Sequence, residues 1–107
     1  MTKQESNITQ LISSRIKNKD PKAEIILFGS HARGEAREDS DWDVLILIDQ
    51  DKQSRLIEKK YRDEMFELEL EIGQPISTFV FSKADWNTKY SITPLYKNIQ
   101  KEGVKIA

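Results

Sequence analysis

The sequence predicts an α/β (α+β) domain: a small mixed β-sheet flanked by helices. Three observations support this prediction. Apolar, β-branched runs typical of buried strands alternate with segments whose apolar residues recur every three or four positions, as on amphipathic helices. Capping residues and Gly or Pro stops separate these segments. With 107 residues and no repeat or linker-like tract, the chain is expected to form a single domain over residues 1–107.

The N-terminal third predicts a helix, a strand and a short helix. The apolar residues of the first segment recur at helical spacing: Ile8, Leu11, Ile12 and Ile16. Ser6 or Asn7 is expected to cap this helix, which should end near Pro21. Residues 24–28 (EIILF) form a short apolar run that predicts a buried strand. A short helix is expected to begin near Ser30.

The middle of the chain predicts a central strand and a long helix. Residues 42–48 (WDVLILI) form the strongest apolar run, which indicates a central strand covered on both faces. The apolar residues of segment 53–72 step at helical spacing: Ile57, Tyr61, Met65, Leu68 and Ile72. Residues 66–72 also alternate with period two, as a half-buried strand would. Because Glu and Leu are strong helix formers, a helix ending at Gly73 is favoured.

The C-terminal third predicts one more strand and two helices. Residues 75–81 (PISTFVF) are expected to form the third strand. Ser82 is expected to cap a short helix that carries Trp86. Pro94 is expected to start the last helix, which should run through about Glu102.

Composition excludes several kinds of chemistry. The absence of cysteine excludes a disulfide scaffold, a thiolate nucleophile and a Cys-based metal site. A single histidine, His31, argues against a His-built zinc site and a Ser–His triad. The 17 basic and 18 acidic residues create no basic field for nucleic acid. No apolar run suits a signal peptide or a membrane span, so a cytoplasmic domain is expected.

One stretch, residues 27–43 (LFGSHARGEAREDSDWD), combines two features of a phosphate–metal site. Gly29 and Ser30 follow a strand and open a helix, which turns backbone N–H groups toward an anion. Asp41 and Asp43, two residues apart at the start of a strand, direct their carboxylates to the same face. Mg²⁺ or Mn²⁺ suits such oxygen ligands. The two features together predict a metal–nucleoside triphosphate as the ligand.

This stretch resembles the signature of the nucleotidyltransferase superfamily, and more narrowly that of the minimal nucleotidyltransferases, whose pattern is G-S-x-A-R-G…S-D-x-D. The resemblance implies that Gly29 and Ser30 contact the triphosphate. Arg33 would support them, on a phosphate or as a bridge to an aspartate. Asp41 and Asp43 would be the catalytic residues that hold the divalent metals. The implied reaction transfers a nucleoside monophosphate, from ATP as the expected donor, to a hydroxyl group and releases pyrophosphate.

The resemblance also implies a protein partner. Minimal nucleotidyltransferases resemble antitoxins that are encoded beside HEPN-domain proteins and modify a tyrosine of that partner. Because the nucleotidyl-transfer core nearly fills the chain, no acceptor-binding domain is expected within it. The expected partners are therefore a nucleoside triphosphate and a HEPN-type protein, or a homo-oligomer, rather than nucleic acid or a membrane.

The sequence departs from the family pattern at a third carboxylate, which family members usually carry on a later strand. Residues 76–81 contain no acid, and the expected position falls near Ser77 or Thr78. Glu71 and Asp85 are alternatives from outside that strand. A second hypothesis is therefore a catalytically weak or inactive nucleotidyltransferase-fold antitoxin that acts as a protein-binding module. A polymerase or tRNA-modifying enzyme is disfavoured by the charge balance and the small size.

Several residues near these motifs are expected to be structural. His31 is expected to be solvated beside the cleft rather than to be a ligand. Trp42 lies between the two aspartates and is expected to point into the core on the opposite face. Trp86, Tyr90 and Tyr96 are expected to pack or to line an interface rather than to stack on a base.

Overall fold

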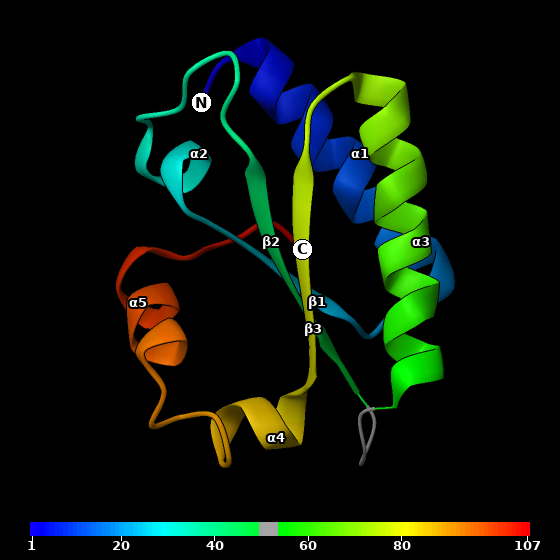
Figure 1. The fold of residues 1–107 in the computed structure, drawn as a ribbon, viewed down its shortest axis with the longest axis vertical. Helices are drawn as coiled ribbons and strands as arrows, with labels where there is room; N and C mark the ends of the chain where they lie inside the picture. The colour runs from blue at the N-terminus through cyan, green and yellow to red at the C-terminus, as the bar shows by residue number, and fades with distance from the viewer. Residues whose placement is uncertain (50–53) are drawn as a thin grey trace.

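The computed structural model describes residues 1–49 and 54–107 and shows a four-stranded mixed sheet between helices (Figure 1). The strands lie in the order β3-β2-β1-β4 and comprise β1 (Glu24–Phe28), β2 (Trp42–Ile48), β3 (Ile76–Ser82) and β4 (Val104–Lys105). β1 pairs with both of its neighbours antiparallel, and β2 pairs with β3 in parallel. The prediction of a small mixed sheet flanked by helices is confirmed.

Helices precede, connect and follow these strands: α1 (Lys3–Lys19), α2 (Ser30–Arg33), α3 (Arg55–Ile72), α4 (Lys83–Asn87) and α5 (Pro94–Glu102). The prediction that Ser6 or Asn7 caps α1 is wrong, because the cap is Thr2. The Thr2 hydroxyl accepts from the Glu5 N–H, and the Glu5 carboxylate accepts from the Thr2 N–H. The apolar stripe of α1 begins only at Ile8, so its periodicity does not reveal the extra turn.

The ambiguous segment after β2 is a helix, as the helix formers predict. Gly73, with φ 70°, ends α3 in the left-handed region that glycine tolerates. Phe66 and Leu70 are 58% and 68% exposed, so the alternating pattern of residues 66–72 does not mark a buried strand face. Residue 53, the first of the predicted helical segment, lies outside the described residues.

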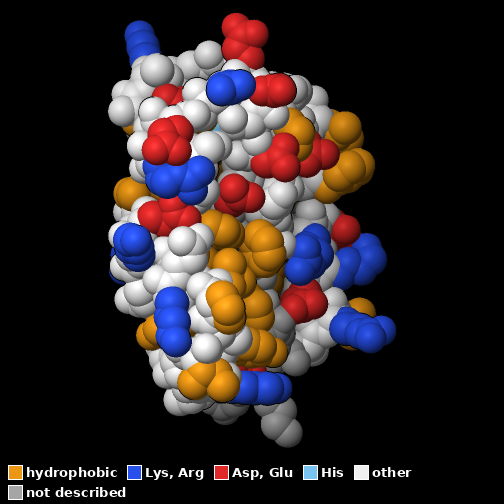
Figure 2. Space-filling model, turned by 60° about the vertical axis from the view of Figure 1, so that its left-hand side comes forward, with side chains coloured by type: hydrophobic (Ala, Val, Ile, Leu, Met, Phe, Trp, Pro, Cys, Tyr) orange, Lys and Arg blue, Asp and Glu red, His pale blue; other side chains and the backbone are white. Residues whose placement is uncertain are grey.

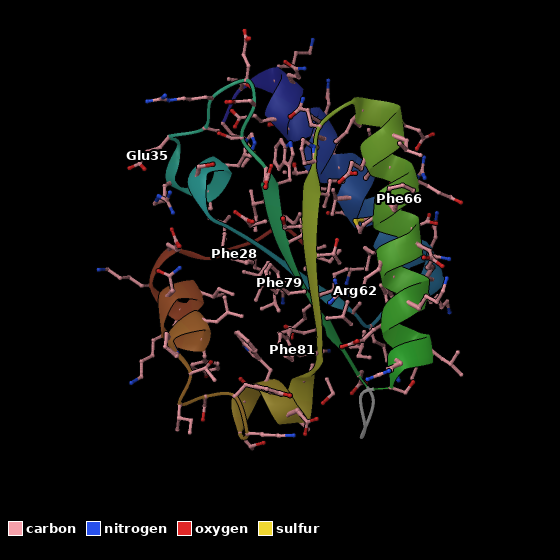
Figure 3. The ribbon with its side chains drawn as sticks, in the orientation of Figure 1. Phe28, Glu35, Arg62, Phe66, Phe79 and Phe81 are labelled. Atoms are coloured by element: carbon pink, nitrogen blue, oxygen red, sulfur yellow. The ribbon has the colours of Figure 1, made fainter. Side chains whose placement is uncertain are left out.

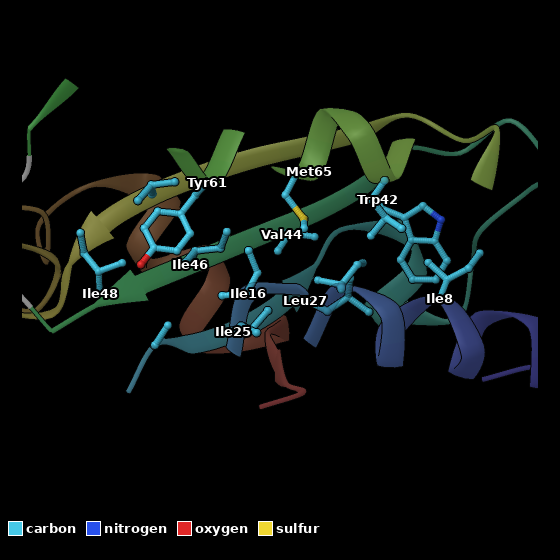
Figure 4. Packing of buried hydrophobic residues seen from close by; sticks show 14 residues of the cluster. Ile8, Ile16, Ile25, Leu27, Trp42, Val44, Ile46, Ile48, Tyr61 and Met65 are labelled. Carbon is cyan, nitrogen blue, oxygen red and sulfur yellow. The ribbon is translucent and has the colours of Figure 1, made fainter. Parts of the chain in front are cut away.

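The sheet carries a hydrophobic cluster on each face. α1 and α3 cover one face, where Trp42 and Ile8 lie at one end of the cluster and Tyr61 and Ile48 at the other (Figure 4). The opposite face packs against α4 and α5 and holds the smaller cluster: Phe28, Leu45, Leu47, Trp86 and Ile99. From the side of α2 and α5, hydrophobic side chains form a band between charged ones (Figure 2). β2 is therefore covered on both faces, as predicted.

The exposed edge of β3 is capped by charged side chains of α3. Arg62 reaches from α3 toward β3 (Figure 3), where its Nη1 donates to the Thr78 carbonyl at 2.6 Å. The Glu69 carboxylate accepts from the Ile76 N–H at 2.7 Å. These bonds satisfy backbone groups that an edge strand otherwise offers to another chain.

β4 is the one element of the described chain that the sequence does not predict. It has two residues, which is too short to show a pattern. Val104 of β4 pairs with Leu27 of β1, and this pairing brings the end of α5 close to the start of α2. Among residues 1–49 and 54–107, no helix is long and apolar enough to cross a membrane.

Candidate functional site

The site lies where the turn after β1 touches the start of β2. Gly29 leads from β1 into α2 with φ 77°, and Phe28 is paired with Asp43 across the two strands. A Cβ on Gly29 would lie 3.0 Å from Asp43 Cγ and closer still to a carboxylate oxygen. Glycine is therefore required here both by its positive φ and by the neighbouring carboxylate. The two halves of the predicted motif are in direct contact.

Asp43 and Asp41 differ in their surroundings. Asp43 lies within β2 on the face of Leu45 and Leu47, whereas Asp41 precedes the strand and is exposed. Burial, and then the charges of Asp41 and Glu102, raise the pKa of Asp43 above its ordinary value, and His31 and Arg33 partly offset this.

This acidic environment suits a divalent cation. A cation beside Asp43 would relieve the repulsion among its acidic neighbours, and carboxylate oxygens are the ligands that Mg²⁺ and Mn²⁺ prefer. The two aspartates therefore fit a hard metal ion. Within the described part of the chain, no group of three or more His, Asp or Glu side chains is arranged as a metal cluster.

Arg33 is held by glutamates rather than by an aspartate. α2 is a single turn, and Arg33 at its end donates to Glu102 Oε2 at 2.8 Å and to Glu35 Oε2 at 3.0 Å. These bonds raise the pKa of Arg33. Arg33 and, more weakly, Asn98 and the Gly29 N–H lower the pKa of Glu102. In this state the Glu102 carboxylate therefore engages two of the groups expected to contact phosphate.

Glu102 is the site residue that sequence analysis missed. It is a charged residue in the last turn of a helix and belongs to no motif. Its position follows from β4, because extending the pairing of Leu27 with Val104 by two residues sets Glu102 opposite Gly29. A two-residue strand leaves no sequence signal for this proximity.

The position of the expected third carboxylate is occupied by a hydroxyl. Ser77 is paired with Asp43 across β2 and β3, whereas Thr78 is paired with Val44 and belongs to the opposite face. The two alternatives lie elsewhere. Glu71 pairs with Arg15 between α3 and α1, and Asp85 follows the far end of β3, in α4.

The prediction that His31 is solvated is wrong. Its side chain is buried, with the residue 6% exposed, and its ring stacks on Trp42 with centroids 3.7 Å apart. Trp42 itself is fully buried, as predicted. The predicted packing role of Trp86 and the tyrosines is confirmed, because Trp86 contacts Tyr96 and Phe81 contacts Tyr90.

Comparisons with known proteins agree with this fold. The family model described as "Nucleotidyltransferase domain" matches residues 10–106. A solved toxin–antitoxin complex with AMP-PNP is similar in fold, with TM-score 0.68 and 18% identity over 92% of this chain and 72% of that chain. The MntA-HepT toxin–antitoxin structure gives TM-score 0.62 and 16% identity, over 95% and 71% of the two chains. No curated protein matches significantly.

Proposed function

The chain belongs to the nucleotidyltransferase domain family, and from this premise we propose that it binds ATP or another nucleoside triphosphate with Mg²⁺ or Mn²⁺. Gly29 and Ser30 hold the phosphates, with Arg33 in support, and Asp41 and Asp43 hold the divalent ion. The ion would neutralise phosphate charge and polarise the reacting phosphorus.

The observation that carries this proposal is the contact between Gly29 and Asp43. The turn at Gly29 offers backbone N–H groups to an anion, and the Gly29 N–H bonds the Glu102 carboxylate here. The same turn lies against a carboxylate whose acidic surroundings favour a cation. The groups that would bind an anion are thus in contact with a carboxylate that would bind a cation. Such a site suits a molecule that carries both charges, and a metal–triphosphate complex is such a molecule.

The proposed acceptor is a hydroxyl group on a partner protein of the HEPN type. Solved structures of similar fold are toxin–antitoxin complexes, one of them with a nucleotide analogue, which supports this choice. In the transfer, the hydroxyl oxygen bonds to the α-phosphorus while the bond from that phosphorus to pyrophosphate breaks. The hydroxyl proton must leave in the same process.

The chain is poorly equipped to accept that proton, so we expect slow transfer. Ser77, beside Asp43, is not a base at neutral pH. Glu102 lies near Asp43, but its bonds to Arg33 lower its pKa and make it a weak base. A positioned base contributes about 10²–10⁴-fold to a rate, and a deficit of this size is expected here.

A second candidate function follows from the same deficit. Among the described residues, no group of three carboxylates is placed to hold a metal ion, which favours a catalytically inactive antitoxin that binds its partner without modifying it. Such a protein-binding module would keep the fold and an interface but would need no metal.

Label transfer from α-labelled ATP to a co-expressed partner separates the two functions. We expect label on the partner with wild type and with the control Asp63→Asn, whose carboxylate lies on the exposed face of α3. The double variant Asp41→Asn/Asp43→Asn should transfer none. The enzyme proposal fails if no label moves with wild type while the double variant still neutralises the partner.

A further inference from the structure

The buried imidazole of His31 links the two halves of the candidate site, the phosphate turn and the strand that carries Asp43, from the α1 side of the sheet. His31 follows Ser30 directly in α2, on the phosphate side of the site. Its ring lies parallel to that of Trp42, with an interplanar angle of 6°. Trp42 stands between Asp41 and Asp43 at the start of β2, on the metal side. One ring stack therefore connects the phosphate turn to the strand that carries the carboxylate.

A second contact anchors this stack to α1. His31 Nδ1 lies 2.8 Å from Glu5 Oε2. The other oxygen of the same carboxylate accepts from the Thr2 N–H at 3.0 Å, within the capping box of α1. These bonds to Thr2 and His31 lower the pKa of Glu5 to about 2, so the carboxylate is charged across the neutral range. A helix terminus with fixed geometry thus orients the imidazole.

Two further contacts hold the stacked rings of His31 and Trp42 in place. His31 Nε2 lies 3.4 Å from the Ser40 carbonyl, in the loop that leads to the aspartates. The indole N–H of Trp42 donates to Gln74 Oε1 at 2.8 Å, just before β3. The stacked pair is therefore bonded to α1 and to the segments before β2 and before β3.

We propose that His31 is a positioning residue, which sets the distance between the phosphate turn at Gly29–Ser30 and the carboxylate of Asp43 through its stack on Trp42. It touches neither nucleotide nor metal, because its ring faces Trp42 and Glu5 on the α1 side of the sheet. This inference rests on the proposed function. Residues that orient metal ligands without touching the metal commonly change metal affinity or activity by about 10–100-fold when they are removed.

The test compares His31→Ala with two matched variants. His31→Phe keeps an aromatic ring to stack on Trp42. Ile48→Ala opens a cavity in the same core cluster at the far end of β2 (Figure 4) and lowers stability away from the site. Two measurements are made on each full-length protein: the Kd for a manganese–AMP-PNP complex, and amide hydrogen exchange of residues 29–34 and 41–43 without metal.

We expect His31→Ala to raise the Kd by about tenfold or more and to speed exchange in both segments. His31→Phe should retain most of the affinity, and Ile48→Ala should change neither quantity selectively. The inference is overturned if His31→Ala and Ile48→Ala, at an equal loss of stability, have the same Kd and the same exchange rates in the two segments. If wild type itself binds no manganese–AMP-PNP, the proposed function fails. The exchange of residues 29–34 and 41–43 then still decides whether His31 couples the two segments.

Discussion

Gly29 and Asp43 are packed so closely that no side chain fits between the phosphate turn and the carboxylate. A Cβ on Gly29 would fall 3.0 Å from Asp43 Cγ, and the φ of 77° further disfavours any other residue. Gly73 also has a positive φ of 70°, but its ψ is 23° where that of Gly29 is −159°, and no described atom lies within 4 Å of its missing Cβ. Gly73 is therefore a control for a positive-φ glycine away from the site, and the backbone at Gly29 tolerates another residue even less.

We expect Gly29→Ala to abolish binding of a manganese–nucleotide complex, because its methyl group must displace the Asp43 carboxylate. Gly73→Ala should cost a backbone strain of about 1–2 kcal/mol and leave the nucleotide Kd unchanged. Thermal unfolding gives the stability of both variants, and calorimetric titration gives the Kd. Equal losses of affinity in the two variants would show that strain alone, and not the contact with Asp43, governs the site.

The raised pKa of Asp43 predicts a pH-dependent penalty in the metal-free protein. The folded chain keeps a proton on Asp43 at pH values where the unfolded chain has lost it, so the free energy of unfolding falls as pH rises through this window. Asp43→Asn removes the penalty. Its thermal midpoint should exceed that of wild type at pH 7, and the difference should vanish at about pH 3, below the ordinary Asp pKa.

Divalent cations should reverse this order of the thermal midpoints. Manganese is expected to raise the midpoint of wild type and to leave Asp43→Asn unchanged, because binding to the folded state alone stabilises it. Asp63→Asn, on the exposed face of α3, is the control for removal of one charge. A lower midpoint for Asp43→Asn than for wild type at pH 7 without metal would contradict the argument.

Glu102 is expected to compete with the nucleotide, because its carboxylate bonds Arg33 and approaches the Gly29 N–H. Glu102→Gln removes the competing charge while keeping the side-chain shape. The Kd for a nucleoside triphosphate should fall by roughly two- to fivefold, the range expected for an exposed ion pair. Glu35→Gln, which removes the other carboxylate partner of Arg33, should have a smaller effect. Weaker binding by Glu102→Gln would instead mean that Glu102 helps to hold the metal–nucleotide.

Local patterns in the sequence predicted most of the fold but only part of the site. β1 and β2 begin and end at the predicted residues because apolar runs with sharp polar ends mark buried strands. Gly73 marks the end of α3 for an equally local reason. The proximity of Glu102 to Gly29 arises from a two-residue strand pairing, and tertiary contacts with Glu5 and Trp42 bury His31. Neither arrangement leaves a periodicity or a spacing in the sequence.

The charged caps on the edge of β3 are expected to keep the chain from associating through that edge. Arg62→Ala frees the Thr78 carbonyl and Glu69→Ala frees the Ile76 N–H, so each should lower the free energy of unfolding by about 1–2 kcal/mol. Both should also increase concentration-dependent self-association, because an uncapped edge offers its backbone groups to a second strand.

Lys59→Ala is the matched control for these substitutions. Lys59 lies on the same helix, where it forms an exposed pair with Asp63, and its removal should cost about 0.5 kcal/mol or less. Chemical denaturation measures the stabilities, and sedimentation velocity at several protein concentrations measures association. If Arg62→Ala and Glu69→Ala stay monomeric at every concentration at which wild type is monomeric, the caps contribute stability alone. The edge would then be protected by the neighbouring surface of α3, where Phe66 lines a shallow hollow together with Ile76 and Thr78 of the strand.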